Sequence, residues 1–202
     1  MTEVPPLCRL FFFRHGETEW SLSRQHTGRT DLPLTARGEE EARALRPLIA
    51  GAKFSHVLAS PRRRARETCE LSGASDRPEI EEDAAEWHYG DYEGVRSTDI
   101  RKERPDWDIF RDGCPNGETP AEIAARADRL IKRISAMRGD VALFSHGQFG
   151  MVFAARWIGL DVGQARHFRI GTATMSILTY DPDHDEIPIF ALWNGSSAGT
   201  YF

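Results

Sequence analysis

A charged segment with a glycine follows directly after four bulky apolar residues near the start of the chain. Leu10 to Phe13 form that apolar run, which predicts a strand buried on both faces. Arg14, His15 and Gly16 come next. Glycine lets the backbone approach a ligand closely, and open α/β sheets place their binding sites at the carboxyl ends of strands. The segment therefore favours an anion-binding site that includes an imidazole, although a strand that simply ends in a polar turn with a solvated His15 would contain the same residues.

Four short motifs occur in a fixed order along the chain. They are Arg-His-Gly-Glu-Thr-Glu-Trp at 14–20, Ser-Pro-Arg-Arg-Arg-Ala-Arg-Glu-Thr at 60–68, Glu-Trp-His-Tyr-Gly at 86–90 and Ser-His-Gly at 145–147. Together they resemble the signature of the histidine phosphatase (phosphoglycerate mutase-like) superfamily. The resemblance implies an enzyme that hydrolyses phosphomonoesters of small metabolites through a phosphohistidine intermediate, without a cofactor.

Phosphoryl transfer needs a nucleophile, cations around the phosphoryl oxygens and an acid at the leaving oxygen. His15 suits the first role, because a neutral imidazole attacks phosphorus without a separate base, and the resemblance implies the same role. A backbone contact to its Nδ1–H, from Gly16 or nearby, would fix the tautomer. Arg14, Arg64 and His146 suit the second role, since guanidinium groups bind phosphate oxygens in pairs.

Two of the residues expected around the phosphoryl oxygens, Arg64 and His146, are identified by their positions in the sequence. Arg64 is the arginine of the Ser-Pro-x-x-Arg-Ala pattern, so we prefer it to its neighbouring arginines. His146 follows a second apolar strand, Val141 to Ser145, just as His15 follows the first. If these strands are neighbours, we expect the two imidazoles to face each other across one phosphate. A metal site with two histidines is the alternative, but it lacks a convincing carboxylate ligand, so we expect no metal.

Glu86 suits the third role, as the general acid. It lies beside Trp87 and Tyr89 and resembles the acid of the family's Glu-x-x-Tyr-Gly motif. Partial burial and an incoming phosphate dianion would both favour its protonated form. The same carboxylate could then activate water against the phosphohistidine.

Further residues are expected to bind the substrate. The loop from Gln25 to Gly28 resembles the family's phosphate-binding segment, and Ser21 departs from the asparagine that many members carry after Glu-Trp. The set assigned to substrate binding is Ser21, Gln25, His26, Thr27, Gly28, Ser60, Tyr89, Gly147 and Gln148.

Several segments look most like a sugar-phosphatase branch close to the sedoheptulose-bisphosphatase-like group. That group carries an arginine in the helix after its second histidine, where this chain has Met151. The sequence therefore leaves open whether the substrate is a sugar monophosphate or a bisphosphate.

Two other functions are weighed against a phosphatase. A cofactor-dependent phosphoglycerate mutase is longer and has an Arg-Arg pair in its cap, for which residues 107–113 offer no counterpart. A non-catalytic phosphate-binding or interaction module is the second alternative. The presence of all five expected catalytic residues argues against it; they are Arg14, His15, Arg64, Glu86 and His146.

Composition limits the class of protein further. The 202 residues fit one domain, with 40% hydrophobic residues and a formal charge of −5 that argues against nucleic-acid binding. The three cysteines show no zinc-binding spacing, residues 1–7 supply no apolar leader, and no stretch approaches the roughly 18 apolar residues of a membrane span. We expect a cytoplasmic protein that binds a small phosphate ester and neither nucleic acid nor membrane; assembly into a homo-oligomer stays open.

The pattern of elements predicts a single α/β domain over 1–202. The expected fold is a phosphoglycerate mutase-like α/β/α sandwich with a mixed, mostly parallel sheet and a small cap insertion at 87–120. Residues 17–33 are expected to be a loop, and one helix is expected from Thr35 to Gly51. The other expected strands are 56–60, 79–80, 141–145, 173–180 and 187–193, and the other expected helices are 61–71, 97–104, 121–137 and 149–158.

Overall fold

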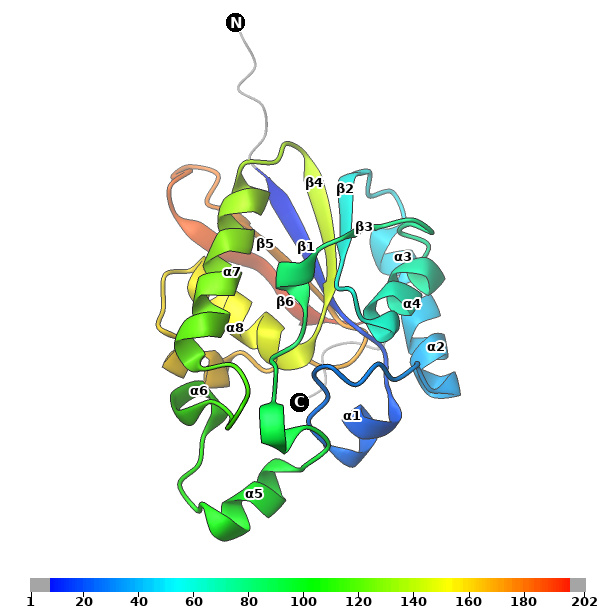
Figure 1. Cartoon of the computed structure of the whole chain (residues 1–202). Coiled ribbons are helices and arrows are strands. Elements are labelled where there is room, and N and C mark those ends of the chain that lie inside the picture. The colour runs from blue at the N-terminus through cyan, green and yellow to red at the C-terminus, as the bar shows by residue number, and fades with distance from the viewer. Residues whose placement is uncertain (1–7, 197–202) are drawn as a thin grey trace, which may run out of the picture.

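The computed structural model describes residues 8–196, so the expectation for residues 1–7 lies outside the described part. Within that part, a six-stranded sheet forms the middle of the protein, with strand order β3-β2-β4-β1-β5-β6 (Figure 1). Its strands are β1 (Arg9–Arg14), β2 (Phe54–Ala59), β3 (Glu79–Ile80), β4 (Asp140–Ser145), β5 (Met175–Tyr180) and β6 (Pro188–Gly195).

Helices cover both faces of the sheet, which confirms the predicted three-layer α/β/α fold (Figure 1). Alternate residues of β1 point to opposite sides, as the two-residue period of a strand requires. Leu10 and Phe12 join the core under α7 (Pro120–Ser135) and α8 (Gly147–Trp157). Phe11 and Phe13 join the second core, under α2 to α4. These three helices are α2 (Ala36–Arg43), α3 (Arg46–Ile49) and α4 (Arg63–Ser72).

The order of strands brings the two expected histidines together. β1 pairs in parallel with β4, and Arg14 lies opposite Ser145 in that register. Both strands end at these residues, so His15 and His146 leave the same edge of the sheet side by side. β5 pairs antiparallel with β1 and with β6, which confirms the predicted terminal hairpin and the mixed sheet.

Local chemistry explains where the helices depart from the prediction. Residues 17–33 are not all loop, because α1 (Glu19–Ser23) begins with a capping box in which Thr18 and Ser21 bond each other's backbone N–H. The single helix expected from Thr35 is divided into α2 and α3, because Pro47 lacks the N–H that would continue α2. Pro61 precedes α4 by two residues instead of beginning it.

Residues 87–120 are rich in aromatic side chains that pack into the same core as α7 and α8. The segment contains two short helices, α5 (Ser97–Glu103) and α6 (Ile109–Asp112), which lie at the lower end of the molecule in Figure 1 with α1. Trp107 and Phe110 are both buried, and the ring of Phe110 contacts Trp87 at a centroid distance of 5.9 Å. The segment is therefore held by apolar burial. No helix within residues 8–196 is both long enough and apolar enough to cross a membrane.

Two glycines let the segment after β1 lie directly on the start of α2. A Cβ on Gly16 would stand 2.3 Å from the carbonyl oxygen of Gly38, and a Cβ on Gly38 would stand 2.1 Å from that of Glu17. Both separations are far below van der Waals contact, and backbone atoms cannot move aside as flexible side chains do. The close approach fixes the backbone on both sides of His15.

This contact predicts that Gly38→Ala destabilises the protein, even though alanine normally favours a helix. We expect a loss of about 2 kcal/mol or more in the free energy of unfolding, the range of overpacking in a tight interior. Gly163→Ala is the matched control, because its Cβ would meet nothing within 4 Å. Urea unfolding of both variants measures the difference, and equal stability of the two would contradict the close packing.

Candidate active site

A cavity of about 460 Å³ opens at the carboxyl ends of β1 and β4. Ten of the residues predicted for the site line it: Arg14, His15, Ser21, Gln25, His26, Thr27, Glu86, Tyr89, Gly147 and Gln148. Four predicted residues are buried without lining it: Gly28, Ser60, Arg64 and His146. Five lining residues are not among the predicted site residues: Arg24, Ser97, Met151, Arg169 and Ile170.

The His15 ring is held in one tautomer by its own chain. Nδ1 lies 2.7 Å from the carbonyl oxygen of Gly16, which can only accept a hydrogen bond, so Nδ1 carries the proton. Burial lowers the pKa of His15 well below its usual value, and the positive charges of Arg64 and Arg14 lower it further. The neutral ring therefore keeps its lone pair on Nε2, which makes no hydrogen bond within the described residues.

His146 contacts His15 and is fixed by two other side chains. The Nε–H of Arg64 donates to Nδ1 of His146 over 3.2 Å, so Nε2 carries the proton and lies 2.7 Å from the Ser60 hydroxyl. Burial, then the charge of Arg64, lowers the pKa of His146 well below its usual value. The two imidazoles meet edge to face with centroids 5.2 Å apart. That contact leaves no room for a phosphate between the rings, which differs from the arrangement expected from the sequence.

Arg64 is fully buried, and its guanidinium organises the loop that follows α1. It donates to the backbone carbonyls of Thr27, Gly28 and Thr30 over 2.9–3.2 Å, as well as to His146. Gly28 suits this crowded place, because a Cβ there would stand 2.4 Å from the carbonyl oxygen of Trp87. In this structure Arg64 and Gly28 support the loop and the second histidine, and the expected contact of Arg64 with phosphate stays a prediction.

The carboxylate of Glu86 lies at the N-terminus of α8 and accepts hydrogen bonds from backbone N–H groups in the first turn of that helix. Oε1 accepts from Trp87 and Phe149, both over 2.8 Å, and Oε2 accepts from Gln148 over 3.0 Å. Burial raises the pKa of Glu86 above its usual value, although these N–H groups and the charge of Arg64 act in the opposite direction. Oε2 has the single N–H partner, so it is the oxygen that can carry a proton.

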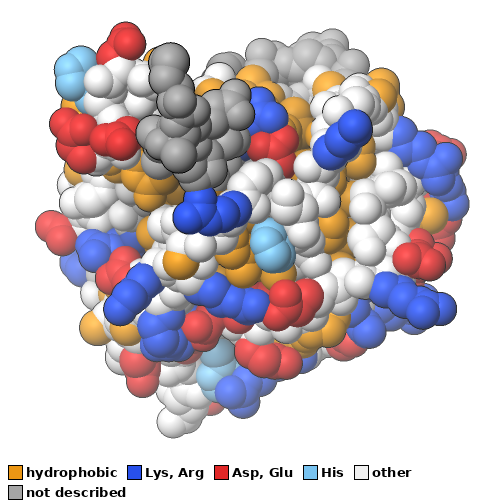
Figure 2. Space-filling model, turned by 90° about the horizontal axis from the view of Figure 1, so that it is seen from above, with side chains coloured by type: hydrophobic (Ala, Val, Ile, Leu, Met, Phe, Trp, Pro, Cys, Tyr) orange, Lys and Arg blue, Asp and Glu red, His pale blue; other side chains and the backbone are white. Residues whose placement is uncertain are grey.

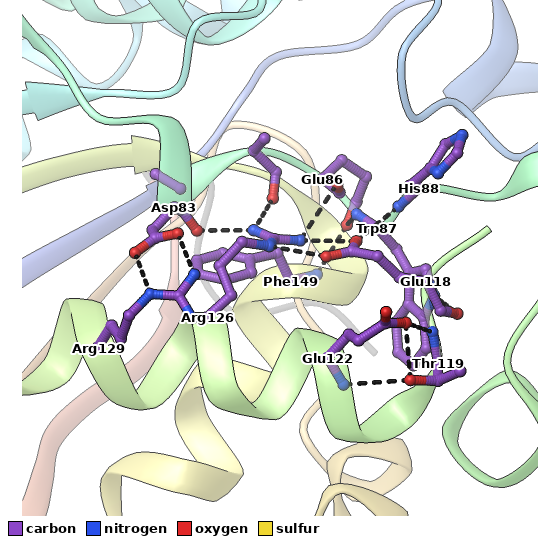
Figure 3. A network of polar contacts seen from close by, with 12 residues as sticks. Asp83, Glu86, Trp87, His88, Glu118, Thr119, Glu122, Arg126, Arg129 and Phe149 are labelled. Atoms are coloured by element: carbon purple, nitrogen blue, oxygen red, sulfur yellow. Dashed lines mark hydrogen bonds and ion pairs between the residues drawn. The ribbon is translucent and has the colours of Figure 1, made fainter.

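A network behind the cavity holds the segment that carries Glu86 (Figure 3). Arg126 of α7 donates to the carbonyls of Asp83, Ala85 and Glu86, and it pairs with both carboxylate oxygens of Glu118 over 2.9 Å. Its guanidinium also lies 4.8 Å from the ring centroid of Phe149, whose N–H bonds Glu86. Sequence patterns did not identify this arginine, because its role depends on contacts that only the fold creates.

Several of the side chains predicted to bind substrate form hydrogen bonds within the protein instead. Ser21 and Thr27 bond the carbonyls of Thr18 and Gln25, and the Gln25 amide donates to the carbonyl of Gly94 over 2.8 Å. His26 stacks on the ring of Tyr89 at 4.5 Å, and its Nε2 lies 3.2 Å from the Ser97 hydroxyl. These contacts give the cavity a wall that is already formed.

Arg14 also lines the cavity. Its Nη1 donates to the carbonyl of Ile170 over 2.7 Å, while its buried Nε has no partner among the described residues. A Cβ on Gly147 would stand 3.3 Å from this guanidinium, so a glycine at the start of α8 lets Arg14 lie against the helix. Within residues 8–196 no group of three or more His, Cys, Asp or Glu side chains could hold a metal ion.

Comparisons with known proteins agree with one another. The profile of the histidine phosphatase superfamily (branch 1) matches residues 10–193. An acid phosphatase of Mycobacterium tuberculosis is 34% identical over 91% of this chain and 92% of its own. The sedoheptulose 1,7-bisphosphatase of Saccharomyces cerevisiae is 38% identical over 80% of this chain and 71% of its own. A solved structure of an open reading frame product from Mycobacterium tuberculosis superimposes with a TM-score of 0.87 at 34% identity, covering 94% and 98% of the two chains.

We predict that the protein loses stability in acid, because it buries the neutral side chain of His26. Burial lowers the pKa of His26 from 6.5 to about 4, so between these pH values the unfolded chain binds a proton that the folded protein does not. Between pH 6.5 and about 4, the free energy of unfolding should fall by about 1.4 kcal/mol for each pH unit on account of this residue. Urea unfolding between pH 7 and pH 4 should show a shallower decline for His26→Gln than for the exposed control His167→Gln. Identical slopes would show that His26 is protonated in the folded protein.

Proposed function

Because the chain belongs to the histidine phosphatase superfamily and holds a buried neutral histidine in a cavity with one acidic group, we propose that it is a metal-independent phosphomonoesterase. Its reaction passes through a phosphohistidine at His15, and its substrate is a small phosphorylated metabolite of the sugar phosphate class. The acid phosphatase and the sedoheptulose bisphosphatase among its relatives support hydrolysis of a phosphate ester.

The observation that carries the proposal is the hydrogen bond between Nδ1 of His15 and the Gly16 carbonyl. A nucleophilic imidazole must be neutral and must have its lone pair at the reacting nitrogen. Burial and the two neighbouring arginines meet the first requirement, and the bond to Gly16 meets the second. His146, by contrast, has both ring nitrogens engaged, with Arg64 and with Ser60, so its lone pair is not free to attack phosphorus.

Arg14 and the start of α8 supply the positive environment for the phosphoryl group. Arg14 lies next to Gly147, and both residues line the cavity with His15. Glu86 already accepts the N–H groups of Gln148 and Phe149, so α8 attracts the anion mainly through its dipole. His146 contacts the His15 ring, and Arg64 holds His146 in place. The phosphate therefore binds on the cavity side of the His15 ring and not between the two rings.

Glu86 completes the reaction as a proton carrier. In the first step, Nε2 of His15 forms a bond to phosphorus, the ester P–O bond breaks, and the leaving oxygen takes the proton from Glu86. In the second step, the Glu86 carboxylate takes a proton from water, the water oxygen attacks phosphorus, and the N–P bond breaks with its electron pair returning to Nε2. Inorganic phosphate leaves, and Glu86 is protonated again.

The segment 87–120 forms the outer wall of this site in our proposal and acts as its cap. Tyr89 and Ser97 of this segment line the cavity, and both contact His26 of the loop after α1. Such a wall excludes water from the developing phosphohistidine, which water would otherwise attack early.

Replacement of Glu86 by glutamine tests the role of the acid. A sugar alkoxide leaves poorly without a proton, so single-turnover phosphate transfer from a sugar phosphate should slow about 10²–10⁴-fold. Nitrophenolate needs little protonation, so transfer from nitrophenyl phosphate should slow much less, and the phosphoenzyme should accumulate because water lacks its base. Stopped-flow kinetics and intact-protein mass spectrometry measure both effects.

His15→Ala is the matched control, because it removes the nucleophile and should form no phosphoenzyme with either substrate. Thermal unfolding of both variants checks that α8 keeps its place after Glu86 is changed. An equal loss of rate on both substrates without a trapped phosphoenzyme would show that Glu86 is not the acid.

A separate prediction concerns the effect of removing metal ions on activity. Protein side chains fill each role in the proposed reaction, so phosphate release should be unchanged after dialysis against a chelator. Activity that disappears with the chelator and returns with magnesium would contradict the proposal.

A further inference from the structure

We propose that Arg24 and Arg169 form a second anion subsite in the active-site cavity, which binds a second acidic group of the substrate, a phosphate or a carboxylate. The inference rests on the proposed phosphatase function and adds the class of substrate: a compact phosphate ester that carries another anionic group away from the scissile phosphate. Arg24 and Arg169 are separate from Arg14, which lies beside His15.

Both arginines line the cavity and are exposed. Within residues 8–196 neither guanidinium makes a hydrogen bond or an ion pair, whereas many of the other arginines are paired with carboxylates, as Arg129 and Arg156 are. Arg169 lies close enough to the first site to add to the effect of burial, which lowers the pKa of Arg14. Two free guanidinium groups around one cavity are suited to an anion, because such groups bind phosphate and carboxylate oxygens in pairs.

The backbone that carries each arginine is fixed. Arg24 ends α1 with a left-handed φ of 63°, and the next residue, Gln25, bonds Trp20 and forms a β-bridge with Arg96. The carbonyl of Arg169 accepts a hydrogen bond from the Trp193 indole over 3.0 Å. A binding site on fixed backbone loses less conformational freedom when the ligand arrives.

The charge of the cavity differs from the charge of the whole protein. Arg14, Arg24 and Arg169 line it, and Glu86 is the one acid among the described residues that do so. The formal charge of the chain is −5. On the opposite face, seen from the end where β1 begins, positive and negative side chains are interspersed (Figure 2). The lining of the cavity is therefore more positive than the face that Figure 2 shows.

The size of the cavity also favours a substrate with two anionic groups. At about 460 Å³ it lies within the range of roughly 300–1,000 Å³ that small-molecule sites occupy, and a single phosphate fills little of it. Met151 of α8 lines the same cavity, at the position where the bisphosphatase-like group carries an arginine. Arg24 and Arg169 supply cations from two loops instead of from that helix.

The test compares sugar phosphates that differ by one anionic group. Fructose 1,6-bisphosphate is compared with fructose 1-phosphate and fructose 6-phosphate, and 6-phosphogluconate is compared with glucose 6-phosphate. Arg24→Gln and Arg169→Gln should each lower kcat/KM about tenfold on the doubly anionic member that uses the subsite, the effect of one lost charged hydrogen bond, and less than twofold on the monophosphates. The exposed Arg138→Gln is the matched control.

The two substrate comparisons identify the second anionic group that the subsite binds. A loss confined to the bisphosphate assigns the subsite to phosphate, and a loss confined to 6-phosphogluconate assigns it to carboxylate. Losses that are equal on monophosphates and doubly anionic substrates, or absent from both, overturn the subsite while the phosphatase function stands.

Absence of phosphate release from every substrate would instead contradict the proposed function, and calorimetry then decides the subsite. Fructose 1,6-bisphosphate or 6-phosphogluconate must then bind about tenfold more weakly to Arg24→Gln and Arg169→Gln than to Arg138→Gln. Equal binding by all three variants would overturn the subsite.

Discussion

The parallel pairing of β1 with β4 is the constraint on which the site depends. Arg14 lies opposite Ser145 in that register, so the chain leaves both strands at the same edge and places His15 against His146. A shift of one residue would turn every apolar side chain of β1 to the opposite face. Each face of β1 has its own packing partners, and Phe13 stacks on its register partner Phe144 with ring centroids 4.5 Å apart, so packing supports the register that brings the two histidines together.

Burial then shifts the protonation equilibria in the direction that the proposed chemistry needs. It lowers the pKa of both histidines, which favours their neutral imidazoles, and it raises the pKa of Glu86 above its usual value, which makes that carboxylate easier to protonate. Each group is also held by backbone: Gly16 fixes His15, and the first turn of α8 fixes Glu86. Arg126 extends this support, because it bonds the segment before Trp87 and rests on Phe149. The site is prepared before a substrate arrives.

Sequence patterns predict the layers and the sheet, because buried strands and capped helices leave local signals, whereas most of the cavity lining is implied by the resemblance to the superfamily's motifs. The pattern around Thr18 was read as loop, since a five-residue helix has little periodicity. The positions of Arg64 and Ser60 behind the lining could not be predicted, because they depend on contacts between distant segments. Arg24 and Arg169 stood among 26 lysines and arginines, and only the fold shows that these two share one cavity.

In the proposed reaction, Nε2 of His15 is the nucleophile because Gly16 holds the proton on Nδ1. The most direct measurement traps the phosphoenzyme in protein labelled with ¹⁵N-histidine and identifies the phosphorylated ring nitrogen by ³¹P–¹⁵N coupling. The geometry predicts a single phosphohistidine, at His15, with phosphorus on Nε2. Phosphorus on Nδ1, on His146 or on no histidine would contradict the account.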